Sequence, residues 1–423
     1  IERLDEAMPA VSAAADSAAA AYVNGAAIGI RGDVGLADEW AHRPGGPAGY
    51  GGGEGEAGDV ILYAFGVQRH DDDDVKRLLK AQINEAATLR IRGAVVIGIA
   101  STAQLRAHGL QEAAMAACTH VLSNHAGEYD GFIALDDGRR IVPTYTTMNA
   151  AVLWTFTAEL FAACTRAGRT PVFTQSALVD TRGERAARYD GQRFHDDLDV
   201  IPVEPGELGR AYLKALRANL LDLGTASWDE LGDVAEAAGN RLLEEHTVLI
   251  HAPGPMVQAH HGGQLAADPH LFVKANYGRM LSLDPGLGHY MLAVGYAQPP
   301  DDDWWGEPDP RLVRDAEFGV AWLISGVLTR PSDLRDNETM IDLYFSLDDA
   351  AVKVPGYDVR ICPTSGVVTE AAMWMLTAQV WEHVHAPIPQ RRPYRPMTRV
   401  EPECSAGAEG PGGLEAACAA AAS

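Results

Sequence analysis

The chain has 423 residues and a formal net charge of −24, from 34 Lys and Arg against 58 Asp and Glu. This acid excess argues against nucleic acid or an anionic membrane as a partner, because phosphate groups are bound through clusters of Lys and Arg. The longest apolar runs, such as residues 93–100 and 318–327, fall short of the roughly 18 residues that a membrane helix requires. The composition therefore predicts a water-soluble protein of two or three domains without a membrane segment.

The five cysteines are an odd number at wide spacing, and no C-x-x-C occurs, so we expect reduced thiols and a cytoplasmic protein. Residues 1–22 are rich in Ala but lack the basic start and compact apolar block of a signal peptide. Neither H-E-x-x-H nor a complete G-x-G-x-x-G is present, and we therefore expect no metal and no cofactor.

Along the first half, an Ala-rich helical pattern precedes three short apolar runs, at residues 26–30, 60–66 and 94–101. Their hydrophobicity is continuous rather than alternating, and helical patterns separate them. Strands of this kind are typical of a parallel sheet that is covered by helices on both faces.

A connector follows at about residues 165–225, with an amphipathic helix around Leu208–Leu223. The next helical pattern carries a predicted capping box, Ser227-x-x-Glu230. Three further apolar runs then appear in the same order as in the first half, at residues 247–251, 290–295 and 319–326.

An internal repeat joins the two halves. The segment RIVPTYTTMNAAVLWTFTAEL at 140–160 aligns without a gap to RICPTSGVVTEAAMWMLTAQV at 360–380, with identity at eight of 21 positions. The repeat predicts two similar domains in tandem. The expected division is a first domain at 1–165, a connector at 166–226, a second domain at 227–386 and a flexible C-terminal tail at 387–423.

Several motifs of the first half stand in the order found in one known family. They are Gly29, Leu36-Ala37-Asp38-Glu39, Arg43 with Gly45-Gly46, Gly58-Asp59-Val60, Ser123-Asn124, Asp130 and Pro143-Thr144-Tyr145-Thr146. On these motifs the first half resembles a sugar isomerase (SIS) domain of the phosphosugar isomerase type. The second half is similar mainly through the repeat, with Asp342, Asp349-Ala350 and Pro363-Thr364-Ser365-Gly366.

The resemblance implies an α/β fold of two tandem SIS-type three-layer αβα sandwiches with parallel, flavodoxin-like sheets. It also implies a small-molecule sugar or sugar-phosphate ligand, aldose–ketose isomerase activity, and a homodimer as a possible assembly. The competing hypothesis is a non-catalytic sugar-binding or regulatory module, so the sequence leaves open whether the protein is an enzyme.

One departure from the family concerns phosphate binding. Phosphosugar-binding members carry Ser-x-Ser-Gly after the second strand, where residues 65–74 here read FGVQRHDDDD. After the first strand, Asp33 takes the place of the family's serine. These acids would repel a phosphate unless Arg31 and Arg69 offset them, so the alternative is a ligand without phosphate.

The predicted catalytic residues are Glu39, His70, His251 and His261. Glu39 matches a family glutamate and could move a proton between sugar carbons as a general base, while a plain helix-surface acid is the alternative. An imidazole titrates near neutrality and could serve the same purpose. For His70, beside Asp71–Asp74, the alternative is a solvated helix start, and for His251 and His261 it is a surface role.

The predicted substrate-binding residues lie where the carboxyl ends of the strands are expected, because ligands of open α/β sheets bind there. Helix capping is the alternative role for the hydroxyl-bearing members. The set comprises Gly29, Arg31, Asp33, Gly66, Gln68, Arg69, Ser101, Thr102 and Thr144 in the first half, and Gly295, Tyr296, Gln298, Ser325 and Ser365 in the second.

Overall fold

The computed structural model describes residues 1–48, 52–66, 72–136, 138, 140–176, 179, 181–198, 200–252, 269–275, 288–295, 318–325, 334–346 and 348–385. By its contacts the chain separates into Ile1–Ala386 and Pro387–Ser423. The predicted C-terminal tail lies outside the described residues. The predicted division of the first 386 residues into two domains and a connector stays a prediction, and the elements of both halves are described below as one unit.

The first half contains a parallel sheet of four described strands in the order β1-β2-β3-β4. All residues of β2 are buried, which explains its continuous hydrophobicity. The strands are β1 (Ile28–Arg31), β2 (Val60–Ala64), β3 (Val95–Ala100) and β4 (His120–Ser123).

The second half contains a five-stranded parallel sheet in the order β11-β10-β9-β7-β8. Counted along the chain from β7, this is the order 2-1-3-4-5 of flavodoxin-like sheets. The predicted α/β class with two parallel sheets is therefore confirmed. The strands are β7 (Val248–His251), β8 (Val273–Lys274), β9 (Tyr290–Val294), β10 (Gly319–Ile324) and β11 (Glu338–Asp342).

Helices cover both faces of the first sheet. Alternate strand residues belong to two separate hydrophobic clusters, one packed under α2 and the other under α4 and α6. This alternation is what a sheet between two helical layers requires. The helices of the first half are α1 (Glu2–Glu6), α2 (Met8–Tyr22), α3 (Val34–His42), α4 (Asp72–Ile91), α5 (Thr102–Ala107), α6 (Gln111–Ala117) and α7 (Tyr145–Arg166).

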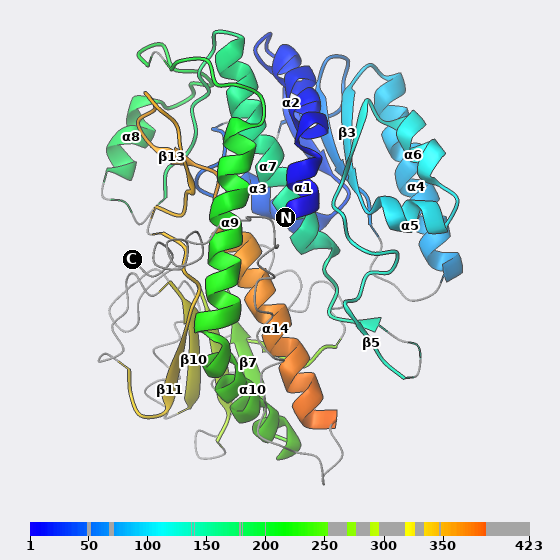
Figure 1. The fold of residues 1–423 in the computed structure, drawn as a ribbon. Helices are drawn as coiled ribbons and strands as arrows, with labels where there is room; N and C mark the ends of the chain where they lie inside the picture. The colour runs from blue at the N-terminus through cyan, green and yellow to red at the C-terminus, as the bar shows by residue number, and fades with distance from the viewer. Residues whose placement is uncertain are drawn as a thin grey trace, which may run out of the picture. The chain divides into compact units, whose positions relative to one another are not determined.

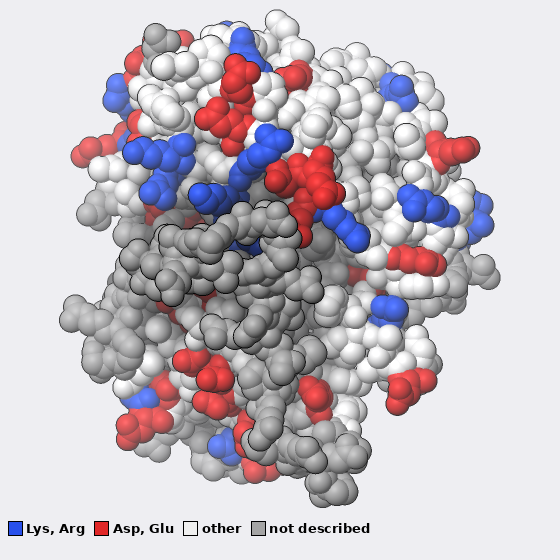
Figure 2. All heavy atoms as spheres, in the orientation of Figure 1, with Lys and Arg blue, Asp and Glu red and all other residues white. Residues whose placement is uncertain are grey.

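The remaining helices are α8 (Arg182–Arg188), α9 (Glu207–Ala226), α10 (Trp228–Leu243) and α14 (Ser365–His385). The predicted amphipathic connector helix is confirmed as α9. None of the helices described is both long and apolar enough to cross a membrane. Figure 2 shows acidic and basic side chains interspersed on the face that it presents.

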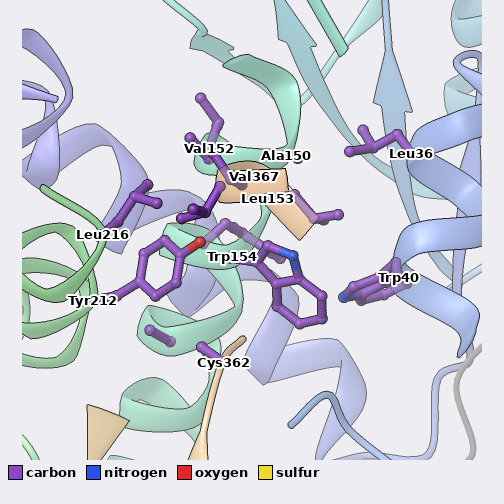
Figure 3. Packing of buried hydrophobic residues seen from close by; sticks show 14 of the residues in the cluster. Leu36, Trp40, Ala150, Val152, Leu153, Trp154, Tyr212, Leu216, Cys362 and Val367 are labelled. Atoms are coloured by element: carbon purple, nitrogen blue, oxygen red, sulfur yellow. The ribbon is translucent and has the colours of Figure 1, made fainter. Parts of the chain in front are cut away.

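The helices that close the two halves meet in one hydrophobic core. Helix α7 packs against α2 and α9, α14 packs against α10, and α7, α9 and α14 also contact one another (Figure 1). Figure 3 shows Trp154 of α7 between Trp40 of α3 and Tyr212 of α9, with Val367 of α14 close by. All four belong to a single cluster that also includes residues of both sheets.

The repeat extends to unusual backbone angles. Val142 and Cys362, which occupy equivalent places before the repeated Pro-Thr, have φ angles of 64° and 62°. A β-branched residue such as valine rarely adopts positive φ, so this shared angle reports a shared local structure. In each half a two-stranded antiparallel hairpin precedes the closing helix, formed by β5 (Ile133–Ala134) with β6 (Arg140–Ile141), and by β12 (Val352–Lys353) with β13 (Arg360–Ile361).

One sequence prediction is wrong. Ser227 stands at the N-cap of α10, but its hydroxyl does not cap the helix. It donates instead to the carbonyl oxygen of Asp342, at 3.1 Å, and to the Tyr344 hydroxyl, at 3.3 Å. The tertiary contact with the end of β11 replaces the local capping interaction.

The three cysteines described, Cys118, Cys164 and Cys362, are buried and free, and burial raises the pKa of Cys118 to about 12.

A buried carboxylate fixes the start of α9 against α7. Glu159 is fully buried, and its two oxygens accept hydrogen bonds from the backbone N–H of Gly206, at 2.7 Å, and of Gly209, at 2.8 Å. The Ser12 hydroxyl donates a third bond of 2.6 Å. The positive helix end and three donors together offset the cost of burying this charge.

We expect Glu159→Gln to lower the free energy of unfolding by about 2–4 kcal/mol. The amide loses the charge-assisted bonds and brings a donor group against backbone N–H groups. Chemical denaturation measures the change, and the matched control is Glu112→Gln, which removes an exposed carboxylate from α6. Equal stability of the two variants would contradict the structural role of Glu159.

Candidate functional site

Several of the predicted binding residues meet at the carboxyl edge of the first sheet. Arg31 ends β1, Gly66 follows β2 and Ser101 follows β3, while Asn124, which was not among the predicted binding residues, follows β4. Because the strands are parallel, these positions lie along one edge. We call the polar side chains there the first-edge cluster: Asp33, Ser101, Asn124, Asp130, Thr146 and Asn149.

Asp33 connects the starts of two helices. It is the N-cap of α3, where its Oδ1 accepts a hydrogen bond of 3.2 Å from the backbone N–H of Leu36. Its Oδ2 accepts a bond of 2.5 Å from the hydroxyl of Thr146 in the first turn of α7. The carboxylate therefore occupies the end of α3, the position where the sequence comparison expected a serine in SIS domains.

Asp130 acts in the same way at α7. Its Oδ1 accepts hydrogen bonds from the backbone N–H groups of Thr144, at 2.7 Å, and Tyr145, at 3.1 Å. Tyr145 itself donates its hydroxyl proton to the carbonyl oxygens of residues 127 and 128. Burial, followed by the negative charge of Asp130, raises the pKa of the Tyr145 phenol well above its usual range.

Ser101 and the two asparagines are held by protein partners. The Ser101 hydroxyl accepts a hydrogen bond from the backbone N–H of Gln104 and donates one of 2.6 Å to the carbonyl oxygen of Gly127. Its capping role at α5 is therefore observed. The Asn124 amide donates a hydrogen bond of 2.8 Å to the side-chain oxygen of Asn149 in α7, and both side chains are buried.

The helix ends at this edge are consequently rich in protein acceptors. Carboxylates serve α3 and α7, and a serine caps α5. A helix N-terminus attracts anions through its free N–H groups. Here those groups already face carboxylates at two of the helices, which disfavours a phosphate at the same places.

Three predicted binding residues, Gly29, Arg31 and Thr102, have partners within the protein. A Cβ added at Gly29 would lie 2.4 Å from the carbonyl oxygen of Gly53, so the close approach of the two backbones requires glycine. Arg31 donates to the same carbonyl and forms an ion pair of 3.4 Å with Glu54. Thr102 shares a hydrogen bond of 3.1 Å with the hydroxyl of Ser123.

In the second half, His251 is buried at the end of β7 and Gly295 follows β9. The Ser325 hydroxyl donates a hydrogen bond of 2.5 Å to the carbonyl oxygen of Phe345, and Ser365 is fully buried at the start of α14. The other predicted residues, His70, Gln68, Arg69, His261, Tyr296 and Gln298, lie outside the described residues.

Glu39 belongs to a buried ionic cluster that joins the two halves. Its carboxylate is fully buried, 2.9 Å from the Arg43 Nε, and Arg43 lies 3.9 Å from the Asp349 carboxylate. A Cβ added at Gly366 of α14 would lie 1.9 Å from a Glu39 oxygen. We call Glu39, Arg43 and Asp349 the buried clasp. Its packing favours a structural role for Glu39, and the predicted catalytic role stays a prediction.

Asp349 repeats the arrangement of Asp130 in the second half. Its carboxylate accepts from the backbone N–H of Ser365, at 3.3 Å, and from the Ser365 hydroxyl, at 2.7 Å. Complete burial raises the pKa of Asp349 to about 7, although Arg43 and Ser365 act in the opposite direction. The nearby Glu39 carboxylate adds to the rise.

The roles of Arg43 and Asp349 were missed from the sequence. Asp349 could have been found from the repeat, since it stands in the second half where Asp130 stands in the first. For Arg43, the i,i+4 spacing from Glu39 could have indicated an ion pair. Nothing local indicated its second partner Asp349, because that residue lies in the other half. Among the described residues, no group of three or more His, Cys, Asp or Glu side chains is placed to hold a metal ion.

No protein-family model matches the sequence, and no curated protein matches it as a relative. Among solved structures, the C-terminal domain of glucosamine-fructose-6-phosphate aminotransferase from Francisella tularensis is 12% identical, with a TM-score of 0.48 over 90% of this chain and 94% of that one. A provisionally named phosphosugar isomerase from Silicibacter pomeroyi is 15% identical, with a TM-score of 0.37 over 90% and 97%.

A provisionally named sugar binding protein from Salmonella typhimurium is 12% identical, with a TM-score of 0.45 over 89% of this chain and 96% of that one. The TM-scores are below 0.5, and the fold assignment therefore rests on the strand order within the two sheets.

The buried clasp makes stability depend on pH. Between about pH 4 and pH 7 the folded chain holds a proton on Asp349 that the unfolded chain releases, because the pKa is raised from 3.8 to about 7. The free energy of unfolding therefore decreases as the pH rises through this window. We expect Asp349→Asn to reduce this slope, as measured by denaturation at several pH values.

The matched control is Asp348→Asn, which alters the adjacent, partly exposed carboxylate 3.8 Å from Arg360. It should keep the slope of the wild-type chain. An equal loss of slope in both variants, or no loss in Asp349→Asn, would contradict the assignment.

Proposed function

We propose that this protein binds a sugar or sugar derivative through hydroxyl groups at the first-edge cluster. The observation that carries the proposal is the bond between Asp33 and Thr146, because a half-buried carboxylate there already accepts a hydrogen bond from a hydroxyl group. A carboxylate is a strong acceptor for the hydroxyl groups of a carbohydrate. The position at the carboxyl edge of a parallel sheet is the usual place for a ligand in this class of fold.

The same geometry favours a ligand that carries no phosphate at this edge. Asp33 and Asp130 supply negative charge at the ends of α3 and α7, where a phosphate would otherwise be bound. Two like charges a few ångströms apart repel each other strongly where water is partly excluded. The hydroxyl groups of a neutral sugar can instead donate hydrogen bonds to these carboxylates.

We expect Asp33→Asn to weaken binding of neutral sugars about tenfold or more, because the substitution removes a charge-assisted acceptor. Isothermal titration against a panel of aldoses, ketoses and amino sugars measures the effect. Glu112→Gln is the control, since it removes one exposed carboxylate away from the first-edge cluster. If no neutral sugar binds, or if Asp33→Asn binds as well as wild type, the proposal is wrong.

Aldose–ketose isomerisation is the second candidate, and the specific observation in its favour is the match of Glu39 to the family glutamate. The buried clasp provides the test. If Glu39 has a structural role, Glu39→Gln should lower the melting temperature and affect ligand binding only through stability, since it leaves Arg43 beside an uncharged partner.

A catalytic role for Glu39 predicts a different result. Turnover of an aldose to a ketose would be lost while ligand affinity and melting temperature stayed close to wild type. Differential scanning fluorimetry and an exchange assay for the sugar C2 proton separate the two roles in one preparation.

A further inference from the structure

His125 lies in a strained turn that occurs in both halves. It follows β4 with a φ angle of 56°, and its backbone N–H donates a hydrogen bond of 3.1 Å to the Ser123 hydroxyl. Tyr344 follows β11 with the same φ of 56°, and its backbone N–H donates a hydrogen bond of 2.8 Å to the Asp342 carboxylate. The two residues therefore occupy equivalent positions, and their side chains can be compared directly.

In the second half the equivalent side chain has a protein partner. The Tyr344 hydroxyl lies 3.3 Å from the hydroxyl of Ser227, the residue that precedes α10. In the first half α2 takes the place of α10, and Ala7 precedes it. Alanine has no hydroxyl to offer, and the His125 Nε2 is buried without a hydrogen-bond partner among the described residues.

A cavity of about 470 Å³ opens beside His125. Its other walls come from α1, from α9, which contacts α1, and from the first turn of α7 (Figure 1). This volume is in the range of small-molecule sites. The lining residues are Ile1, Glu2, Arg3, His125, Met148, Arg217, Leu220 and Leu221.

The charges around this cavity favour an anion. Arg3 has no ion-pair partner among the described residues, and Arg217 pairs only loosely with Glu2, at 3.6 Å, where both side chains are exposed. Glu6 is the other acidic group near His125. Burial, followed by the positive charge of Arg3, lowers the pKa of His125, so the neutral imidazole has a nitrogen without a partner in a positive field.

We propose that the cavity between His125, Arg3 and Arg217 is a binding site for a small anion, through one carboxylate or phosphate group. The guanidinium groups would pair with the anion, and His125 would donate a hydrogen bond to it. The apolar wall formed by Met148, Leu220 and Leu221 would hold the carbon skeleton of an organic anion.

This site is separate from Asp33, although Asn124 of the first-edge cluster is the residue next to His125. Asp33 follows β1 and His125 follows β4, which are three strand spacings apart, or about 14 Å. One sugar ring does not span that distance. The proposal therefore does not depend on sugar binding at Asp33, and the two can succeed or fail independently.

The test follows the imidazole signals of the full chain by NMR at pH 7 while acetate or inorganic phosphate is added. A saturable shift of the His125 signal is expected, with His120 at the start of β4 as the internal control that should not move. Arg3→Gln and Arg217→Gln should each weaken the binding about tenfold, the effect of losing one charged contact. A response to only one of the two anions supports the site and assigns its chemical class.

The matched variant is His125→Tyr, which places in the cavity the residue that the second half carries at the same backbone angle. Binding measured by calorimetry should be lost, while the backbone tolerates tyrosine as it does at Tyr344. The double variant Ala7→Ser with His125→Tyr rebuilds the bond of the second half and should melt higher than His125→Tyr alone. If the His125 signal does not saturate with either anion, or if the arginine variants respond as wild type does, the proposal is overturned.

Discussion

Two helices, α7 and α14, are apolar on nearly every side, and each has to be buried between a sheet and other helices. Almost every residue of α7 is inaccessible to water, including its polar ones. A helix of this kind cannot lie on a surface without exposing a large apolar area. The two helices therefore contact each other and α9, and residues of both sheets belong to the same hydrophobic cluster. Joining the halves follows from this burial.

Burial of the closing helices also determines where charge is tolerated. Three buried carboxylates, those of Glu159, Asp130 and Asp349, face helix ends, hydroxyls or an arginine. Each would cost several kcal/mol without such partners. At the carboxyl edge of the first sheet, Asp33 and Asp130 likewise face helix ends and make that edge acidic. Their negative charge disfavours a phosphate group there.

The two halves keep the same backbone but use it differently. Val142 and Cys362 share one strained angle, and His125 and Tyr344 share another. At the second pair the side chains have diverged: tyrosine bonds to Ser227, whereas histidine lies beside a cavity. Comparison of one half with the other thus separates what the fold requires from what a single half adds.

The sequence by itself determined the class of the fold and its repeat, because strand hydrophobicity and the matching segments at 140–160 and 360–380 are local patterns. It also placed Arg31, Gly66 and Ser101 at the ends of strands, since a strand end can be read from the run that precedes it. Only the tertiary structure decided that the Glu39–Arg43 pair faces Asp349, that Ser227 bonds to Tyr344, and that His125 borders a cavity. These contacts join residues far apart in the chain, and local spacing contains no information about such distances.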